Sequence, residues 1–221
     1  RLGPERACAQ GWISPRAMRN GIIVTVLFAC LIGSALLFYA GWELTIVGLL
    51  CVLFAFLYTT GPYPLSYNGW GDVLVIVFFG FVPVGGTYYV QALTWTSDTT
   101  VASLICGLLI DTLLVVNNYR DREADARSGK RTVIVRFGEK FGRYLYLMLG
   151  VAASLLCFWF FFEGHLFAAL LPLLYLIPHV LTWRRMVQIH SGKKLNSILG
   201  ETSRNMLLMG ILLSIGFLIR H

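Results

Sequence analysis

Charged residues are scarce in this chain of 221 residues: they make up 13% of it, whereas hydrophobic residues make up 57%. Together with a mean hydropathy of +0.71, this scarcity excludes a soluble globular domain and a disordered chain. Cysteines are also few. The five cysteines are odd in number and show no Cys-x-x-Cys spacing, which excludes a disulfide scaffold and argues against a cysteine metal site. The composition therefore predicts an integral membrane protein.

Seven apolar stretches have about the 20 residues that a transmembrane helix needs. They cover residues 20–41, 44–61, 73–92, 98–118, 143–162, 165–183 and 203–220. Transmembrane strands would instead show short segments of alternating hydrophobicity. The sequence therefore predicts an all-α, polytopic transmembrane helix bundle with seven spans, formed by a single domain over residues 1–221.

The basic residues support this division, because short cytoplasmic loops retain Lys and Arg. Segments 1–19, 119–143 and 184–204, which the spans place on one face, hold four, eight and five of the 18 basic residues; only Arg220 lies opposite. The net charge of +7 is thus explained by membrane topology, and no nucleic-acid partner is expected. We expect these segments and the 62–72 loop to be cytoplasmic.

The fourth span leads into a polar run, Asn117-Asn118-Tyr119-Arg120-Asp121-Arg122-Glu123-Ala124-Asp125. On a helix, Asn117, Asp121 and Asp125 share one face. Mg²⁺ prefers such oxygen ligands and is commonly completed by substrate phosphates. Three cations that suit phosphate follow closely: Lys130, Arg131 and Arg136. The run therefore predicts a Mg²⁺ and phosphate site; the alternative is a solvated, mixed-charge helix end.

Segment 58–72 also departs from an ordinary connection. Its two prolines and three glycines forbid a continuous helix, yet it carries three tyrosines and a tryptophan. A capping or re-entrant loop over a cavity is one interpretation, and an interfacial turn with aromatic anchors is the other.

Asp111, deep in the fourth span, is either a functional residue or a structural acid with a partner. As an acid that couples ion movement to transport, it would suit a small transporter.

The polar run resembles a motif of the UbiA superfamily of intramembrane prenyltransferases. Asn117-Asn118-x-x-Asp121-x-x-x-Asp125, followed by Ser128-Gly129-Lys130-Arg131-Thr132 and Val135-Arg136-Phe137-Gly138, looks like the second Asp-rich motif of that family. The paired asparagines and Gly-Lys-Arg-Thr are most similar to the 1,4-dihydroxy-2-naphthoate polyprenyltransferases of menaquinone and phylloquinone synthesis. Residues 3–14 and 72–91 agree with the same family, so the resemblance covers nearly the whole chain.

The resemblance implies a nine-helix bundle whose central cavity is roofed by two Asp-rich motifs that hold a prenyl diphosphate through Mg²⁺. Seven spans instead of nine, and the lack of a first Asp-rich motif, lead us to expect that an N-terminal pair of helices is missing from this chain and that the chain alone is inactive. The implied location is the bacterial inner membrane, with the active site on the cytoplasmic face.

The resemblance also implies roles for individual residues. Asp121, Asp125 and Asn117 are the expected Mg²⁺ ligands, with Asn118 as an alternative ligand or orienting group, and Lys130 and Arg131 are expected to contact the diphosphate during catalysis. The further candidates for substrate binding are Arg6, Tyr63, Tyr67, Asn118, Arg136 and Asp111. Arg6 would bind the aromatic carboxylate or the diphosphate, and Asp111 would assist deprotonation of the ring. Many relatives have Tyr-x-x-x-Lys in the 58–72 loop, but no lysine follows Tyr63 here.

The implied reaction transfers a polyprenyl group from a polyprenyl diphosphate to 1,4-dihydroxy-2-naphthoate, with loss of the carboxylate, and gives demethylmenaquinone or the phylloquinone precursor. Metal ions and basic residues would stabilise the departing diphosphate. Prenylation of 4-hydroxybenzoate, homogentisate or haem stays an alternative, as does the small transporter. The expected partners are the two substrates and the lipid bilayer.

Overall fold

The structure is a computed structural model that describes residues 2–219 of the chain. Its α-helices are α1 (Pro15–Ser34), α2 (Leu37–Ala40), α3 (Glu43–Thr59), α4 (Gly71–Val75), α5 (Gly86–Ala92), α6 (Ser97–Arg127), α7 (Val133–Leu156), α8 (Trp159–Phe162), α9 (Leu166–Leu170), α10 (Leu176–Ile189) and α11 (Asn196–Leu218). A π-helical segment, Ile76–Gly85, joins α4 to α5, and short 3-10 turns cover Leu65–Tyr67, Leu171–Tyr175 and Lys193–Leu195.

The predicted all-α membrane bundle is confirmed. Within the described residues, six helical stretches are long and apolar enough to cross a membrane: α1–α2, α4–α5, α6, α7–α8, α9–α10 and α11 with its preceding turn. The remaining predicted span, 44–61, corresponds to α3, an apolar helix of 17 residues that is shorter than these six, so six of the seven predicted spans have the length to cross a membrane. Arg220, the cation predicted on the opposite face, lies outside the described residues.

Hydroxyl side chains define where three of the long helices begin. Ser14, Thr96 and Thr132 each accept a hydrogen bond from the backbone N–H three residues later, at the starts of α1, α6 and α7. Such N-caps satisfy donors that a helix cannot pair internally. At its other end α6 continues past the predicted span to Arg127, so the whole polar run of the sequence is helical.

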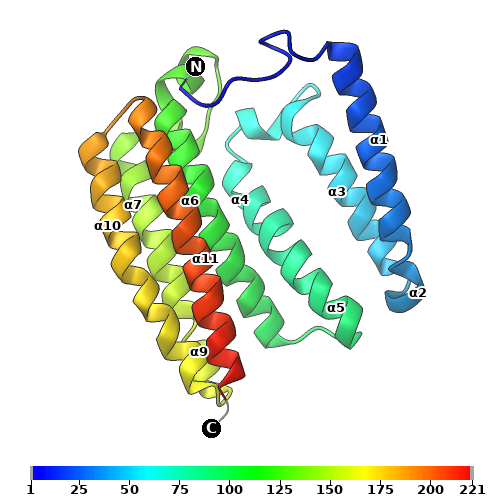
Figure 1. The fold of residues 1–221 in the computed structure, drawn as a ribbon, viewed down its shortest axis with the longest axis vertical. Helices are drawn as coiled ribbons and strands as arrows, with labels where there is room; N and C mark the ends of the chain where they lie inside the picture. The colour runs from blue at the N-terminus through cyan, green and yellow to red at the C-terminus, as the bar shows by residue number, and fades with distance from the viewer. Residues whose placement is uncertain (1, 220–221) are drawn as a thin grey trace.

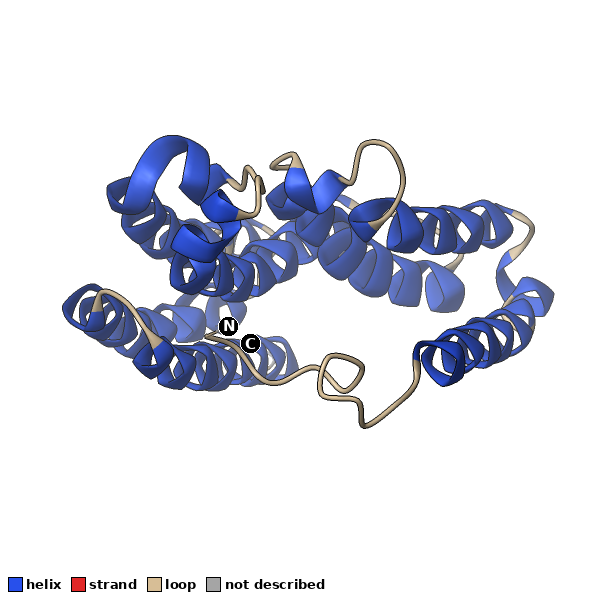
Figure 2. Cartoon of the chain, turned by 90° about the horizontal axis from the view of Figure 1, so that it is seen from above, coloured by secondary structure: helices blue, strands red, loops and turns tan. Residues whose placement is uncertain are grey.

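The helices form a packed bundle and a looser arm (Figure 1). Helices α6, α7, α9, α10 and α11 pack together, with two clusters of buried side chains between them, and α4–α5 lies against α6. Helices α1 and α3 lie beyond α4–α5, and α1 has no buried residue. Seen from above, the helices follow an open arc, and the segment before α1 runs across its open side (Figure 2).

The loops predicted to share one face meet at the same end of the bundle. The backbone N–H of Arg131 donates to the carbonyl of Tyr67 at 2.7 Å, which joins the α6–α7 connection to the α3–α4 loop. The side chain of Asn196, at the start of α11, accepts from Arg120 at 2.9 Å and donates to the carbonyl of Leu2 at 3.1 Å. We call this end the basic face, because it gathers the loops that hold most of the Lys and Arg residues.

Two glycines allow α6 and the π-helical segment to approach closely. A Cβ on Gly80 would lie 2.8 Å from the Cα of Gly107, and a Cβ on Gly107 would lie 2.9 Å from the Cα of Ile76. Both distances are shorter than two non-bonded carbon atoms tolerate, and the atoms that a Cβ would contact belong to the backbone, which cannot move aside easily. Small residues at these positions therefore set the distance between the two elements.

We expect Gly80→Ala and Gly107→Ala each to destabilise the protein by about 1–3 kcal/mol, because overpacking forces the backbones apart. Gly210→Ala in α11 is the matched control, since a Cβ there meets no atom within 4 Å. Thermal unfolding in detergent measures the difference. Equal midpoints for the three variants would contradict the close packing.

Candidate functional site

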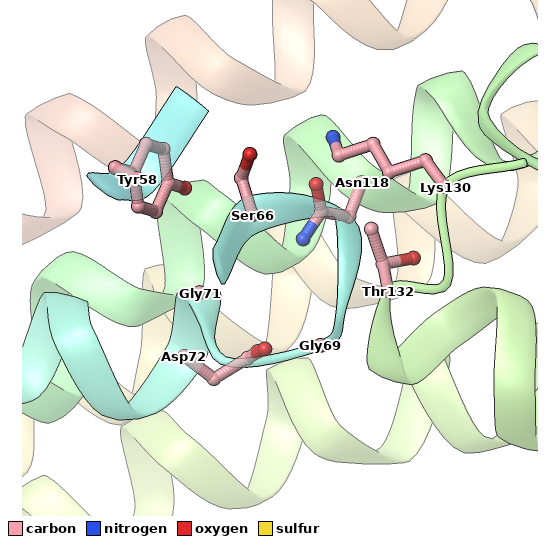
Figure 3. Close-up of a pocket in the computed structure, with 8 residues that line it drawn as sticks. All are labelled: Tyr58, Ser66, Gly69, Gly71, Asp72, Asn118, Lys130 and Thr132. Carbon is pink, nitrogen blue, oxygen red and sulfur yellow. The ribbon is translucent and has the colours of Figure 1, made fainter. Parts of the chain in front are cut away.

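A pocket lies at the basic face, where α3, the following loop, α4 and the end of α6 come together (Figure 3). It is small: its volume of about 10 Å³ has room for about one water molecule. Its lining residues are Tyr58, Ser66, Gly69, Gly71, Asp72, Asn118, Lys130 and Thr132. The 58–72 loop thus forms one wall of a pocket, which agrees with its interpretation as a capping loop. Two of the candidate residues, Asn118 and Lys130, also line this pocket.

A buried arginine organises the end of α6. Arg120 donates to both carboxylate oxygens of Asp121, at 2.8 and 2.6 Å, and to the side-chain oxygen of Asn117 at 2.7 Å. Its side chain is only 2% exposed, while that of Asp121 is 20% exposed. Asn117 and Asp121 do share one face of the helix, and the guanidinium fixes both side chains. Arg120 was not among the predicted site residues: its partners Asn117 and Asp121 lie within α6, but its burial and its bond to Asn196 depend on packing against α11.

Asp125 is held by Lys130, which follows it after a tight turn. The ammonium of Lys130 lies 3.2 Å from a carboxylate oxygen of Asp125, and the backbone N–H of Lys130 donates to the Asp125 carbonyl at 2.9 Å. Gly129 adopts a positive φ of 76°, the conformation in which glycine commonly ends a helix. The turn places Lys130 at the pocket and beside the acidic face of α6.

The donor set of α6 fits a hard divalent cation that is shared with a substrate. Asn117, Asp121 and Asp125 offer amide and carboxylate oxygens, and each carboxylate oxygen keeps a lone pair beyond the bond it accepts from Arg120 or Lys130. Among residues 2–219 no group of three His, Cys, Asp or Glu side chains could hold a metal by itself. Two carboxylates completed by phosphate oxygens are, however, a common arrangement for Mg²⁺.

Arg131 and Arg136 hold the capping loop. The Arg131 N–H bonds to Tyr67, while the guanidinium of Arg136 donates to the carbonyl of Asn68 at 2.7 Å and to that of Arg131 at 3.1 Å. Gly69 fits against this contact, since a Cβ there would lie 2.9 Å from the Arg131 carbonyl oxygen. The predicted phosphate cations thus also connect the loop to the Asp-rich motif.

Three other candidates lie away from the pocket lining. Tyr63 and Tyr67 are 55% and 42% exposed, and Arg6 is exposed in the segment before α1. The tyrosine that lines the pocket is instead Tyr58, at the end of α3. The sequence signal that could have identified Tyr58 is its position at the end of an apolar span, immediately before the proline-rich loop.

Two acids within the membrane-spanning helices have unsatisfied oxygens. Asp111 in α6 is 1% exposed, and one oxygen of Asp111 and one of Asp72 are buried without a hydrogen-bond partner among the described residues. Both acids interact electrostatically with each other and with Tyr58. Asp72 was not among the candidates, although its position at the start of a span is a signal. Buried polar groups without partners are rare in proteins and mark places where a ligand can bind.

Comparisons with known proteins agree on one family. The family model described as the UbiA prenyltransferase family matches residues 2–214. The chain is 36% identical to a 1,4-dihydroxy-2-naphthoate octaprenyltransferase of Haemophilus influenzae over 99% of this chain and 73% of that protein. It is 38% identical to the protein of that name in Escherichia coli, over 71% of this chain and 53% of the relative.

A third protein of the same name, from Mycobacterium tuberculosis, is 37% identical over 72% of this chain and 54% of its own length. The chain therefore aligns with about three quarters of the Haemophilus protein and about half of the other two. No solved structure matches the chain.

We expect Arg136→Gln to loosen the capping loop, because it removes the charged donor that bonds the Asn68 carbonyl. The loss of one partly exposed hydrogen bond of this kind predicts roughly fivefold faster amide exchange in residues 65–70. Arg127→Gln is the control, since Arg127 is exposed and donates only within its own helix, to the carbonyl of Glu123. Hydrogen exchange with mass spectrometry compares the two, and unchanged exchange in Arg136→Gln would contradict the role of this contact.

Proposed function

Because the chain belongs to the UbiA prenyltransferase family, we propose that it transfers a polyprenyl group from a polyprenyl diphosphate to 1,4-dihydroxy-2-naphthoate. The carboxylate leaves as CO2 and the diphosphate departs, so the product is the reduced, quinol form of demethylmenaquinone or of the phylloquinone precursor. The observation that carries the proposal is the pocket at the end of α6, which Asn118 and Lys130 of the Asp-rich motif line together with Asp72 and the capping loop. The names of the relatives support the naphthoate as acceptor.

The diphosphate is assigned to the acidic face of α6. Asp121, Asp125 and Asn117 would hold Mg²⁺, which, when bound, neutralises charge on the departing diphosphate. Arg120 keeps the oxygens of Asn117 and Asp121 in place before substrate arrives, so their arrangement costs little reorganisation during the reaction. Lys130, and Arg131 beside it, supply positive charge where the diphosphate leaves.

The acceptor is assigned to the two buried acids. The unpaired oxygens of Asp72 and Asp111 are hydrogen-bond acceptors, and the two hydroxyl groups of the naphthoate are donors. Hydroxyl groups bonded to carboxylates make the ring more electron-rich, which favours attack of a ring carbon on the cation-like prenyl carbon as the bond to diphosphate breaks. Asp111 is thereby proposed as a substrate-binding acid that assists removal of a ring proton, and Asp72 joins it in this role.

The roles of the other predicted site residues are assigned from the sequence and from the solvent exposure of their side chains. Arg6, Tyr63 and Tyr67 are exposed at the basic face, so they are proposed to contact substrates as these enter the site. We assign the whole chain to one prenyltransferase domain. Its basic face is proposed to be cytoplasmic and its membrane the bacterial inner membrane, because short cytoplasmic loops retain Lys and Arg.

Asp121→Asn is expected to lower prenyl transfer on the order of a hundredfold, since the charge that binds Mg²⁺ is lost while an oxygen remains for Arg120. Glu123→Gln is the control, an exposed acid two residues away in the same helix. The assay supplies Mg²⁺, labelled polyprenyl diphosphate and either dihydroxynaphthoate, 4-hydroxybenzoate or homogentisate to membranes that contain the protein expressed from its complete gene.

Full activity of Asp121→Asn would contradict the metal assignment, and preferential turnover of another acceptor would contradict the naphthoate. The same assay tests the prediction that the chain beginning at Arg1 is inactive by itself.

Asp72→Asn and Asp111→Asn are each expected to raise KM for dihydroxynaphthoate by roughly tenfold, because a hydrogen bond from a ring hydroxyl to the carboxyl group is weakened. KM for the polyprenyl diphosphate should stay unchanged. Asp98→Asn, in the first turn of the same helix at the opposite end, serves as the control and should alter neither constant. An equal rise in both constants would indicate a structural role and contradict the assignment of the acceptor.

A further inference from the structure

A second pocket, outside the site described above, lies between α10 and α11; it is open to the surroundings and has a volume of about 460 Å³. The two helices run side by side at one edge of the bundle (Figure 1). Three arginines line the pocket, Arg184 and Arg185 from α10 and Arg204 from α11. We propose that this pocket binds the phosphate headgroup of an anionic phospholipid. None of its residues belongs to the pocket of Figure 3, so the proposal does not depend on the proposed function.

The charge of the pocket suits a phosphodiester. Arg185 forms an ion pair with Glu201 at 2.6 Å, which leaves the other two guanidinium groups uncompensated. Arg184 and Arg204 are exposed, and neither forms an ion pair with another residue in the described part of the chain. Guanidinium groups bind phosphate oxygens through two parallel hydrogen bonds, so two free arginines facing one pocket form a strong anion site.

Buried polar side chains hold the floor of the pocket in one arrangement. Asn205 donates to the hydroxyl of Thr182 at 2.9 Å, and that hydroxyl donates to Glu201 at 3.4 Å. All three side chains are buried, and Glu201 in turn orients Arg185. The pocket is therefore built from contacts between α10 and α11, and ligand binding needs no rearrangement of its floor.

The position of the arginines along the helices matches a lipid headgroup. In α10 and its preceding turns, residues 166–183 contain no Asp, Glu, Lys or Arg, and the same is true of residues 205–218 in α11. The cations thus stand on both helices where the apolar run meets the basic face. Basic pockets between transmembrane helices at this level are typical binding sites of anionic lipids.

Exposed apolar side chains continue from the pocket toward the opposite end. Leu174 is exposed in the 3-10 turn before α10, Ile177 and Leu181 are exposed on α10, and Leu208 and Ile211 are exposed on α11. Leu174 lies ten residues before Arg184, about 15 Å along the helix. A phosphate at the arginines would therefore place acyl chains along apolar surface, whereas a free phosphate ion would leave this surface unused. This continuity favours the lipid as the occupant.

The test titrates the purified full-length protein with dioleoylphosphatidylglycerol and measures bound lipid by native mass spectrometry. The double variant Arg184→Gln/Arg204→Gln is expected to bind on the order of thirtyfold more weakly. The matched control, Lys193→Gln/Lys194→Gln, removes the same charge from the adjoining connection outside the pocket and should bind as the wild type does. Dioleoylphosphatidylcholine, whose headgroup is zwitterionic, should bind more weakly to the wild type.

Equal weakening in both double variants would show diffuse attraction to the basic face and overturn the proposal. So would unchanged binding in Arg184→Gln/Arg204→Gln, equal binding of the two lipids, or displacement of the lipid by an equal concentration of inorganic phosphate. If circular dichroism shows that the double variant does not fold, the single variants Arg184→Gln and Arg204→Gln carry the same test, each with a loss of roughly fivefold.

Discussion

The arrangement of the basic face depends on one buried cation, the guanidinium of Arg120. A charge with a side chain 2% exposed is tolerated only when it is paired, and Asp121, Asn117 and Asn196 together satisfy it. Through Asn196 the same group reaches α11 and the carbonyl of Leu2. One electrostatic requirement therefore orders the end of α6, joins it to α11 and, through Asn196, links both to Leu2.

The polar side chains of α6 lie at successive depths, from the basic face toward the interior of the bundle. This order suits a reaction between a charged donor and an aromatic acceptor. Asp121 and Asp125 stand at the basic face, where water can reach a diphosphate. Asn118 lines the pocket, and Asp111 lies seven residues earlier, almost two turns and about 10 Å deeper. A diphosphate bound at the end of the helix and a ring bound near Asp111 would place the reacting carbons between them, in surroundings that exclude water from the prenyl cation.

Membrane topology was predictable because it follows from local composition. Runs of apolar residues set the seven helices, and the distribution of Lys and Arg placed the loops at one end, as the hydrogen bonds of Tyr67 and Asn196 confirm. Asp72 and Tyr58 stand at span ends, but that they share a pocket with Asn118 follows only from the packing of α3 and α4 against α6, and the burial of Arg120 likewise depends on α11. Arg136 likewise could not be placed from the sequence. A cation beside an acidic motif predicts a phosphate contact, yet in the structure its guanidinium donates to the carbonyl of Asn68.

Charge balance also bears on the order in which ligands reach the site. The two acids of the motif are each paired, Asp121 with Arg120 and Asp125 with Lys130, so their negative charge is compensated before substrate binds. Compensated carboxylates offer little attraction to a free divalent cation. On the proposed function, a diphosphate would bring anionic oxygens of its own beside those of Asp121, Asp125 and Asn117. Mg²⁺ and the prenyl diphosphate would then bind together, at oxygens that Arg120 already orients.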